Sequence, residues 1–210
     1  MKLLVAITSL AAFVAATPIE LERRGDDKPN PNEVYVESLT WAGSGCPPGS
    51  AVYDLGEGAT VVSISFSKYV AATGKEQKAE DARKNCNVRM KMHYPQGWTY
   101  TVATSDFRGY AQVPKGCRAK LGAQFWFSGR SETATCSIPF NTPCEENYFK
   151  TTSVATESLV WATCGVTGPL FNINSDAAVD CKENAILGVD TLDTNFIMKF
   201  HLSWKKCPKD

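Results

Sequence analysis

The chain has 210 residues, of which 22 are basic and 22 acidic, so its formal net charge is +0. A balanced charge without a basic cluster disfavours nucleic-acid binding and polybasic membrane attachment, because both need a concentrated positive surface. Hydrophobic residues make up 43% of the chain, which is enough for the core of one domain.

The first residues follow the pattern of a secretory signal peptide over 1–16. Lys2 gives a positive start, residues 3–14 form an apolar run, and small side chains precede a cleavage point after Ala16. A spanning helix needs about 20 apolar residues, so this run is too short to be a membrane anchor. We expect a secreted, extracellular protein, with cell-wall association as one option.

Residues 17–24 are interpreted as a short pro-segment that ends in the dibasic pair Arg23-Arg24. An ordinary charged tail is the alternative. Cleavage after Arg24 leaves 186 residues, with 19 basic and 20 acidic side chains. Residues 25–33 are polar and contain proline, which predicts a flexible N-terminus before a single β domain over 34–210.

Alternation of apolar and polar residues predicts β-strands, since successive side chains of a strand point to opposite sides of a sheet. Only 75–85 has a helical composition, and glycine and proline mark the turns. Many short strands predict an all-β fold, an antiparallel β-sandwich, with a β-barrel as the alternative. In chain order the expected strands are 34–41, 61–66, 87–93, 98–104, 107–113, 119–127, 148–153, 155–162, 169–174 and 196–204.

An even number of cysteines in an oxidising compartment predicts four disulfides. Metal binding is disfavoured, because zinc sites usually contain closely spaced Cys-x-x-Cys pairs that are absent here. The best pair is Cys46–Cys86, followed by Cys136–Cys144 across a proline-containing turn, with Cys164–Cys207 third. The eight cysteines are Cys46, Cys86, Cys117, Cys136, Cys144, Cys164, Cys181 and Cys207.

The residue types that perform acid–base chemistry form no recognisable catalytic motif. His93 and His201 both fall on the polar sides of expected strands, where a surface histidine is the simpler interpretation. A copper-dependent oxygenase needs an N-terminal histidine, which neither cleavage site provides. Acidic pairs that might serve glycoside hydrolysis or bind calcium lie in loop-like stretches, and chance accounts for them: Glu145-Glu146, Asp176 with Asp180, and Asp190 with Asp193. We predict no enzyme activity, catalytic residue, cofactor or metal.

Aromatic residues are concentrated in the middle of the chain. Phe125 and Phe127 share the core side of their strand, so Trp126 is expected to point outward. An exposed tryptophan can stack on a sugar or anchor a protein partner, although a covering loop is the alternative. Trp126 and Trp98 are therefore the candidate surface-binding residues.

Several segments occurring in order resemble the secreted domain-of-unknown-function family 4360 of filamentous fungi, over roughly residues 38–207. The most specific are Arg83-Lys-Asn-Cys86 and Phe107-Arg-Gly-Tyr-Ala111; others are Tyr94-Pro-Gln-Gly-Trp98, Trp161-Ala-Thr-Cys164 and Ser203-Trp-Lys-Lys-Cys207. The resemblance implies secretion and a β-rich fold, and it supplies no catalytic residues. Four cysteines are additional to the usual set of the family: Cys117, Cys136, Cys144 and Cys181.

The leading functional hypothesis is a non-catalytic secreted protein that acts at a cell or host surface, as an effector, a virulence-associated protein, or a cell-wall or spore-surface component. The alternative is a carbohydrate-binding or carbohydrate-active secreted protein. The expected partner is an extracellular protein or a cell-wall polysaccharide.

Overall fold

The computed structural model describes residues 28–141, 143–164, 168–188 and 196–208. The expected signal peptide with Ala16, the expected pro-segment with Arg23 and Arg24, and the acidic pair Asp190 and Asp193 lie outside the described residues. The processing and domain boundaries at the N-terminus therefore stay predictions.

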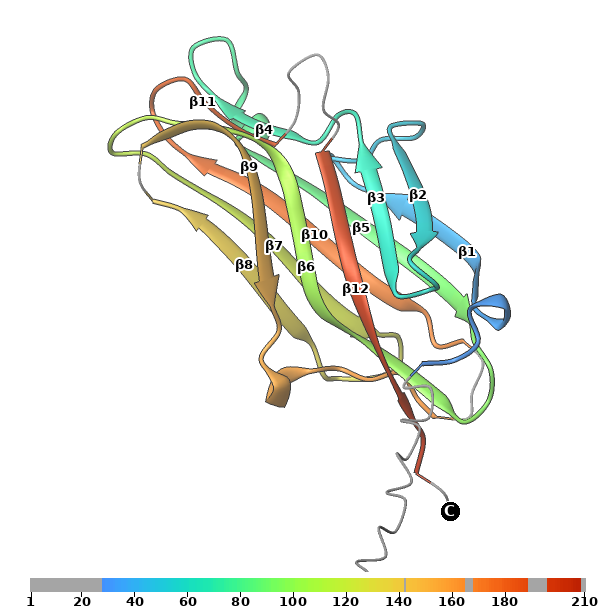
Figure 1. The fold of residues 1–210 in the computed structure, drawn as a ribbon. Helices are drawn as coiled ribbons and strands as arrows, with labels where there is room; N and C mark the ends of the chain where they lie inside the picture. The colour runs from blue at the N-terminus through green and yellow to red at the C-terminus, as the bar shows by residue number, and fades with distance from the viewer. Residues whose placement is uncertain (1–27, 142, 165–167, 189–195, 209–210) are drawn as a thin grey trace, which may run out of the picture.

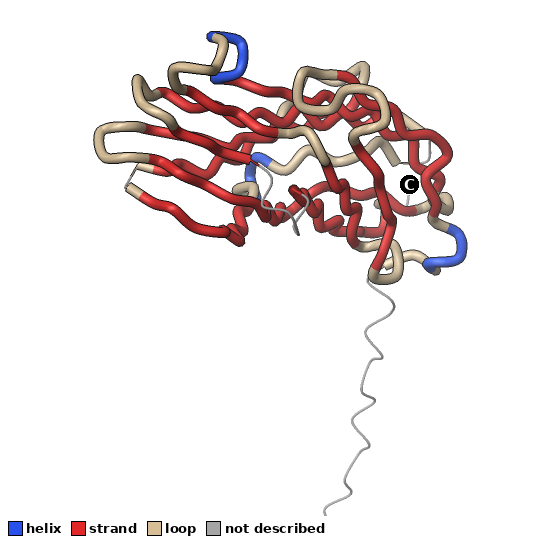
Figure 2. The backbone as a smooth tube through the Cα atoms, turned by 90° about the horizontal axis from the view of Figure 1, so that it is seen from above, coloured by secondary structure: helices blue, strands red, loops and turns tan. Residues whose placement is uncertain are grey.

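Two antiparallel sheets pack face to face, which confirms the β-sandwich over the barrel alternative (Figures 1 and 2). Sheet A has the order β1 (Tyr35–Ala42), β5 (Arg83–His93), β10 (Phe171–Asp180), β7 (Arg118–Phe127) and β8 (Ala134–Phe140). Sheet B has the order β2 (Ala51–Gly56), β3 (Val61–Phe66), β12 (Phe196–Lys206), β6 (Trp98–Val113), β11 (Ala185–Gly188) and β4 (Val70–Thr73), and β9 (Cys144–Ser153) pairs with β6.

The core lies between the sheets and is built by the alternation that the sequence predicts. On β12, Met198 and Phe200 are buried while Lys199 and His201 remain partly exposed. Aromatic rings join the two sheets: the Phe125 and Phe200 centroids are 5.6 Å apart, and those of Tyr100 and Phe127 are 5.4 Å apart. Each such buried side chain stabilises the fold by about 2 kcal/mol relative to exposure.

The long strand β6 replaces two strands that were expected at 98–104 and 107–113. Its register with β12 shifts between His201 and Leu202, so one irregularity is absorbed without ending the strand. β6 pairs with β12 and β11 and, over 104–113, with β9. This central position brings side chains from three strands onto one surface.

The helix expected at 75–85 is wrong in extent. The described helices are single 3-10 turns: η1 (Pro31–Glu33), η2 (Ala79–Ala82) and η3 (Thr156–Ser158), and β5 begins at Arg83. An isolated two-turn helix is marginal in water, whereas Arg83 and Lys84 pair with Ala178 and Ala177 of β10. Sheet pairing therefore outweighs the local helical composition.

The strand expected at 155–162 is also wrong. Apart from η3, this segment is irregular and lies along the edge of β6, where Ala162 N donates to Tyr100 O. The Thr99 and Thr101 hydroxyls donate to the carbonyls of Ala162 and Val160. These bonds tie the segment to β6 and satisfy two buried threonines.

Three disulfides are present. Cys46–Cys86 and Cys164–Cys207 link the pairs named first and third from the sequence, and Cys117–Cys181 joins two of the additional cysteines. Cys46–Cys86 attaches the loop after β1 to β5, and Gly45 N donates to Asn85 O beside it.

The expected Cys136–Cys144 disulfide and the expectation of four bridges are both wrong, because these two thiols are free. Cys136 lies in the middle of β8 opposite Ala123, whereas Cys144 is the first residue of β9 and pairs with Val113 of the other sheet. Four residues of β8 separate Cys136 from the strand end, about 13 Å of extended chain. A disulfide needs Cα atoms within about 7 Å.

Replacing Cys46 and Cys86 together by alanine should lower the free energy of unfolding by up to about 4 kcal/mol. In the chain-entropy model the bridge restricts a loop of 40 residues in the unfolded chain. Urea unfolding followed by tryptophan fluorescence measures the change. Cys144→Ser is the control and should stay within about 0.5 kcal/mol of the parent. Equal stability of the double variant and the control would contradict a stabilising role of the Cys46–Cys86 disulfide.

Thiol titration should give two reactive groups per chain in denaturant, with Cys136 silent in the native protein. Burial raises the pKa of Cys136 to about 11, which removes the reactive thiolate. Cys144 is partly exposed and should react more readily. A count of zero under denaturing, non-reducing conditions would restore the fourth disulfide and contradict the structure.

Candidate functional site

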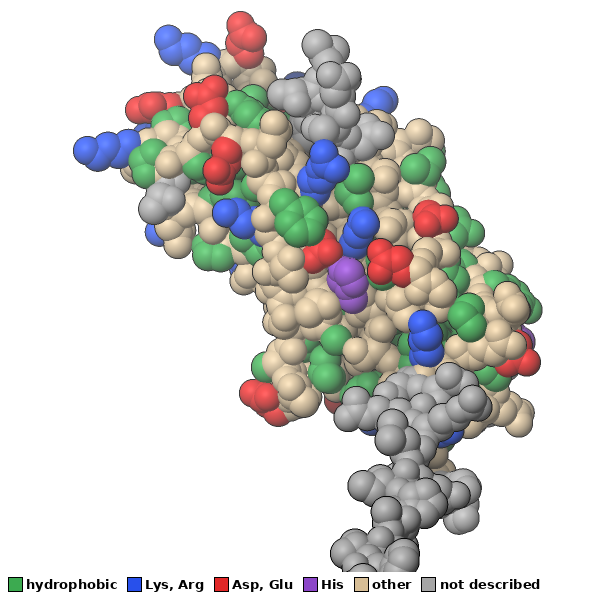
Figure 3. Space-filling view, viewed as in Figure 1, with side chains coloured by type: hydrophobic (Ala, Val, Ile, Leu, Met, Phe, Trp, Pro, Cys, Tyr) green, Lys and Arg blue, Asp and Glu red, His purple; other side chains and the backbone are tan. Residues whose placement is uncertain are grey.

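The outer surface of sheet B carries a row of polar side chains that face each other across five strands. Pairing register aligns, in order across the sheet, Asp54 of β2, Ser63 of β3, Lys199 of β12, Asp106 of β6 and Thr151 of β9. We call this surface the Asp106 face. Figure 3 shows acidic, basic and histidine side chains gathered near its middle.

A second row lies beside the first and adds apolar groups. Ile197 of β12, Arg108 of β6 and Phe149 of β9 are opposite each other in register. Phe149 is 63% exposed although it lies in the middle of β9.

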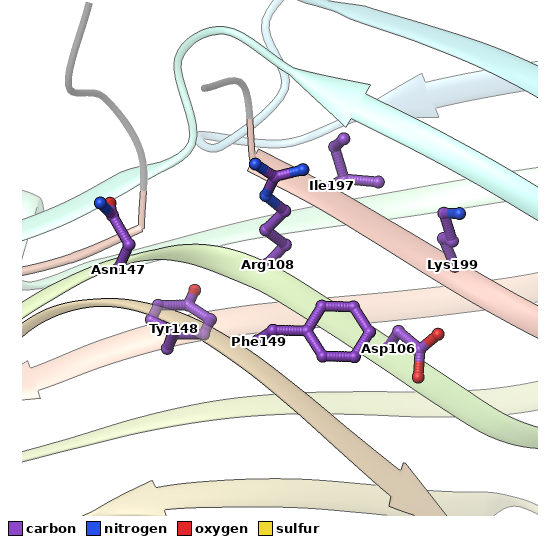
Figure 4. Close-up of a pocket in the computed structure, with 7 residues that line it drawn as sticks. All are labelled: Asp106, Arg108, Asn147, Tyr148, Phe149, Ile197 and Lys199. Carbon is purple, nitrogen blue, oxygen red and sulfur yellow. The ribbon is translucent and has the colours of Figure 1, made fainter. Parts of the chain in front are cut away.

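A surface pocket of about 460 Å³ lies where the two rows cross β12, β6 and β9. In Figure 4 the ring of Phe149 extends across β6 toward Asp106, with Arg108 and Lys199 on the β6 and β12 side. The pocket is lined by Asp106, Arg108, Asn147, Tyr148, Phe149, Ile197 and Lys199.

Both carboxylate oxygens of Asp106 have a hydrogen-bond partner on this surface. His201 Nε2 lies 2.7 Å from Oδ2, and the Thr151 hydroxyl donates to Oδ1 at 2.7 Å. The Asp106 side chain is 13% exposed. Partial burial opposes its ionisation, but the hydrogen bonds from His201 and Thr151 and the nearby Lys199 charge hold its pKa below the usual value.

The lowered pKa keeps the Asp106 carboxylate ionised at neutral pH, so it is a negative charge and a hydrogen-bond acceptor on this surface. Asp106 also fixes the orientation of the His201 ring. The pair therefore presents a fixed charge pattern beside the exposed ring of Phe149.

The structure does not bring the two histidines together. His93 lies on sheet A, where its ring stacks on Tyr35 at 4.6 Å and Glu37 lies 3.5 Å from Nδ1. His201 has a firm carboxylate partner, so its interpretation as a simple surface histidine is incomplete. Its partner Asp106 is 95 residues away in the chain, and no local motif could have revealed it.

The acidic pairs have ordinary partners. Glu145 accepts a hydrogen bond from the Tyr110 hydroxyl, and Glu146 lies 3.9 Å from Lys150. Asp180 pairs with Arg118 at 2.9 Å. Within the described ranges, no group of three metal-ligating side chains occurs and no helix has the length and apolar character needed to cross a membrane.

The two candidate tryptophans lie on different sheets. Trp126 is half-buried on the outer surface of sheet A, as its outward direction on β7 required. Trp98 begins β6 and is half-buried, with Lys206 Nζ 5.6 Å from its ring centroid. Neither lines the pocket, whose exposed aromatic residue, Phe149, was missed from the sequence.

The Asp106 pairing should give the protein a measurable acid-sensitive contribution to stability. A lowered folded-state pKa means that this contribution is present above the ordinary carboxyl value of about 4 and disappears as the pH falls through the folded value. Asp106→Asn should therefore cost about 1 kcal/mol at pH 6 and little at pH 2–3. Urea midpoints across this range measure it. Asp54→Asn, on the same surface, is the control, and a pH-independent cost for Asp106→Asn contradicts the assignment.

The comparisons with known proteins agree with the expected secretion. The sequence model described as "Domain of unknown function (DUF4360)" matches residues 32–207. An "Uncharacterized secreted protein" of Arthroderma benhamiae is 32% identical over 186 residues, covering 87% of this chain and 76% of the relative. The enzymatically active domain of bacteriophage CBA120 tailspike protein 4 aligns with 85% of this chain and 20% of its own at 11% identity, but the TM-score of 0.25 supports no argument. The chain belongs to the DUF4360 family of domains of unknown function.

Proposed function

We propose that this protein is a non-catalytic secreted protein that acts at a cell or host surface and binds a protein partner there through the Asp106 face. The observation that carries the proposal is the exposed Phe149 ring beside Arg108 at a pocket of about 460 Å³. Aromatic and arginine side chains are the groups that most often dominate the binding energy of protein interfaces.

The Asp106 face carries charges of both signs, which supports a protein partner more than a polymer that carries charges of one sign. Cationic Lys199 is opposite anionic Asp106 on the neighbouring strand, cationic Arg108 lies two residues further along β6, and anionic Asp54 is on β2. Such a pattern favours a partner with complementary charges of both signs, and it contributes mainly to specificity and association rate.

The platform beneath these groups favours binding without rearrangement. Phe149 and Arg108 are on directly paired strands, and Tyr148 anchors β9 by pointing into the core, where its ring lies 5.1 Å from that of Phe140. A pre-formed surface loses little conformational freedom on association.

The test measures binding of fluorescently labelled mature protein to intact fungal hyphae and to host cells, before and after protease treatment of the cells. Saturable binding to one of them that protease treatment abolishes is expected. Phe149→Ala and Arg108→Ala should each weaken it by about tenfold, as for an interface hot spot.

Val52→Ala is a matched control, because Val52 is an exposed apolar residue at the edge of the same sheet and outside the pocket. It should leave binding unchanged. Absence of saturable binding to either cell type, or binding that survives both Phe149→Ala and Arg108→Ala, would overturn the proposal.

A further inference from the structure

The outer surface of sheet A carries an uncharged row of amide and hydroxyl side chains. Asn87 of β5, Asn174 of β10, Gln124 of β7 and Thr135 of β8 are directly opposite one another in register. We call this set the amide row. Neighbouring strands are about 4.8 Å apart, so the row spans about 14 Å, enough for a short stretch of polysaccharide.

The amides of this row are available to a ligand. Asn87 and Asn174 are half-buried and Gln124 is exposed, and their side chains have no hydrogen-bond partner among the described residues. Each amide offers both donors and an acceptor, which matches a sugar hydroxyl that also does both. A half-buried polar group gains most when a ligand completes its hydrogen bonds.

Trp126 lies two residues after Gln124 on β7, so its side chain is on the same outer surface. It is opposite Asn172 of β10, which in turn is opposite Arg89 of β5. Asn172 is only 4% exposed, and its Nδ2 contacts the Trp126 carbonyl oxygen at 3.4 Å and the Ser128 hydroxyl at 3.0 Å. These contacts fix the end of β7, so the position of Trp126 is set before any ligand arrives.

The charges around the amide row favour a neutral ligand. Arg83 lies 3.6 Å from Asp176 and Arg118 lies 2.9 Å from Asp180, whereas Arg89, in the row of Trp126, is a charge without an ion-pair partner among the described residues. The row itself carries no charge. The Asp106 face on the opposite sheet carries charges of both signs, so the two surfaces suit ligands of different chemistry.

From this juxtaposition we infer that the amide row and Trp126 form a binding surface for a neutral polysaccharide. One sugar ring stacks on Trp126, and the hydroxyls of the following sugars bond to Asn174, Gln124 and Asn87. Aromatic stacking uses the apolar side of a pyranose ring, and amide groups use its rim. This surface lies on the other sheet from the Asp106 face and does not depend on the proposed function.

The experiment is a pull-down of the full mature protein on insoluble chitin, β-1,3-glucan and cellulose, followed by binding isotherms on the polysaccharide that retains it. Retention on at least one is expected, with little change between low and high salt. Trp126→Ala should weaken binding by about tenfold or more, and Asn174→Ala by about threefold to tenfold.

Gln124→Glu guards against a folding artefact, because it keeps the shape of an exposed side chain and adds a charge to the neutral row. It should weaken binding while leaving the unfolding midpoint unchanged. Phe149→Ala is the aromatic control, because Phe149 is exposed on sheet B, and it should bind like the parent.

Three outcomes would overturn the inference: no retention on any neutral polysaccharide, retention unaffected by Trp126→Ala and Gln124→Glu, or stronger, salt-sensitive retention on an anionic polysaccharide such as polygalacturonate. Its failure is separable from failure of the proposed function. The cell assay responds to protease treatment and Phe149→Ala, whereas this one responds to Trp126→Ala.

Discussion

The pairing of β6 with β12 is the constraint on which the candidate site depends. These strands are paired from Trp98 to Arg108 on one side and from Ile197 to Lys206 on the other, with one register shift between His201 and Leu202. Because side chains alternate along a strand, this pairing sends Phe107 and Met198 into the core and Asp106 and Lys199 outward. A register slip of one residue would exchange the buried and exposed sets, so core burial and site geometry are fixed by the same interaction.

Two of the disulfides join residues at the ends of the strands. Cys164–Cys207 joins the segment after η3 to the residue that follows β12, and Cys117–Cys181 joins the residues that flank β7 and β10. Strand ends open more readily than strand centres, since they have fewer neighbours. The bridges therefore restrain the ends, while the ring contacts of Phe125 with Phe200 and of Tyr100 with Phe127 hold the middle of the sandwich.

Long alternating strands could be predicted from sequence, and short ones could not. Residues 61–66 coincide with β3, and the inward residues of β7 and β5 are those that the alternation indicates. β4 and β11 have four residues each, too few to show a period, and β8 was overlooked because Cys136 and Pro139 suggested a turn. Their places in the sheets are set by tertiary pairing.

The candidate site was harder to predict than the fold, because its parts are remote in the chain. Asp106 and His201 meet only once β6 and β12 are paired, and Thr151 joins them from β9. One local signal did exist. Tyr148 and Phe149 are consecutive aromatic residues on an expected strand, and both cannot face the core. The same reasoning correctly placed Trp126 outside, and it would have exposed Phe149 as well.

The sandwich separates two surfaces of unlike chemistry. The sheets of a β-sandwich are about 10 Å apart, and the core between them is filled by large rings such as Phe125 and Phe171. Side chains on opposite outer surfaces share no partner, so changes at Phe149 and Trp126 should act additively. We therefore propose that the two surfaces, one with paired charges and an exposed ring and the other with neutral amides and a tryptophan, bind different ligands independently.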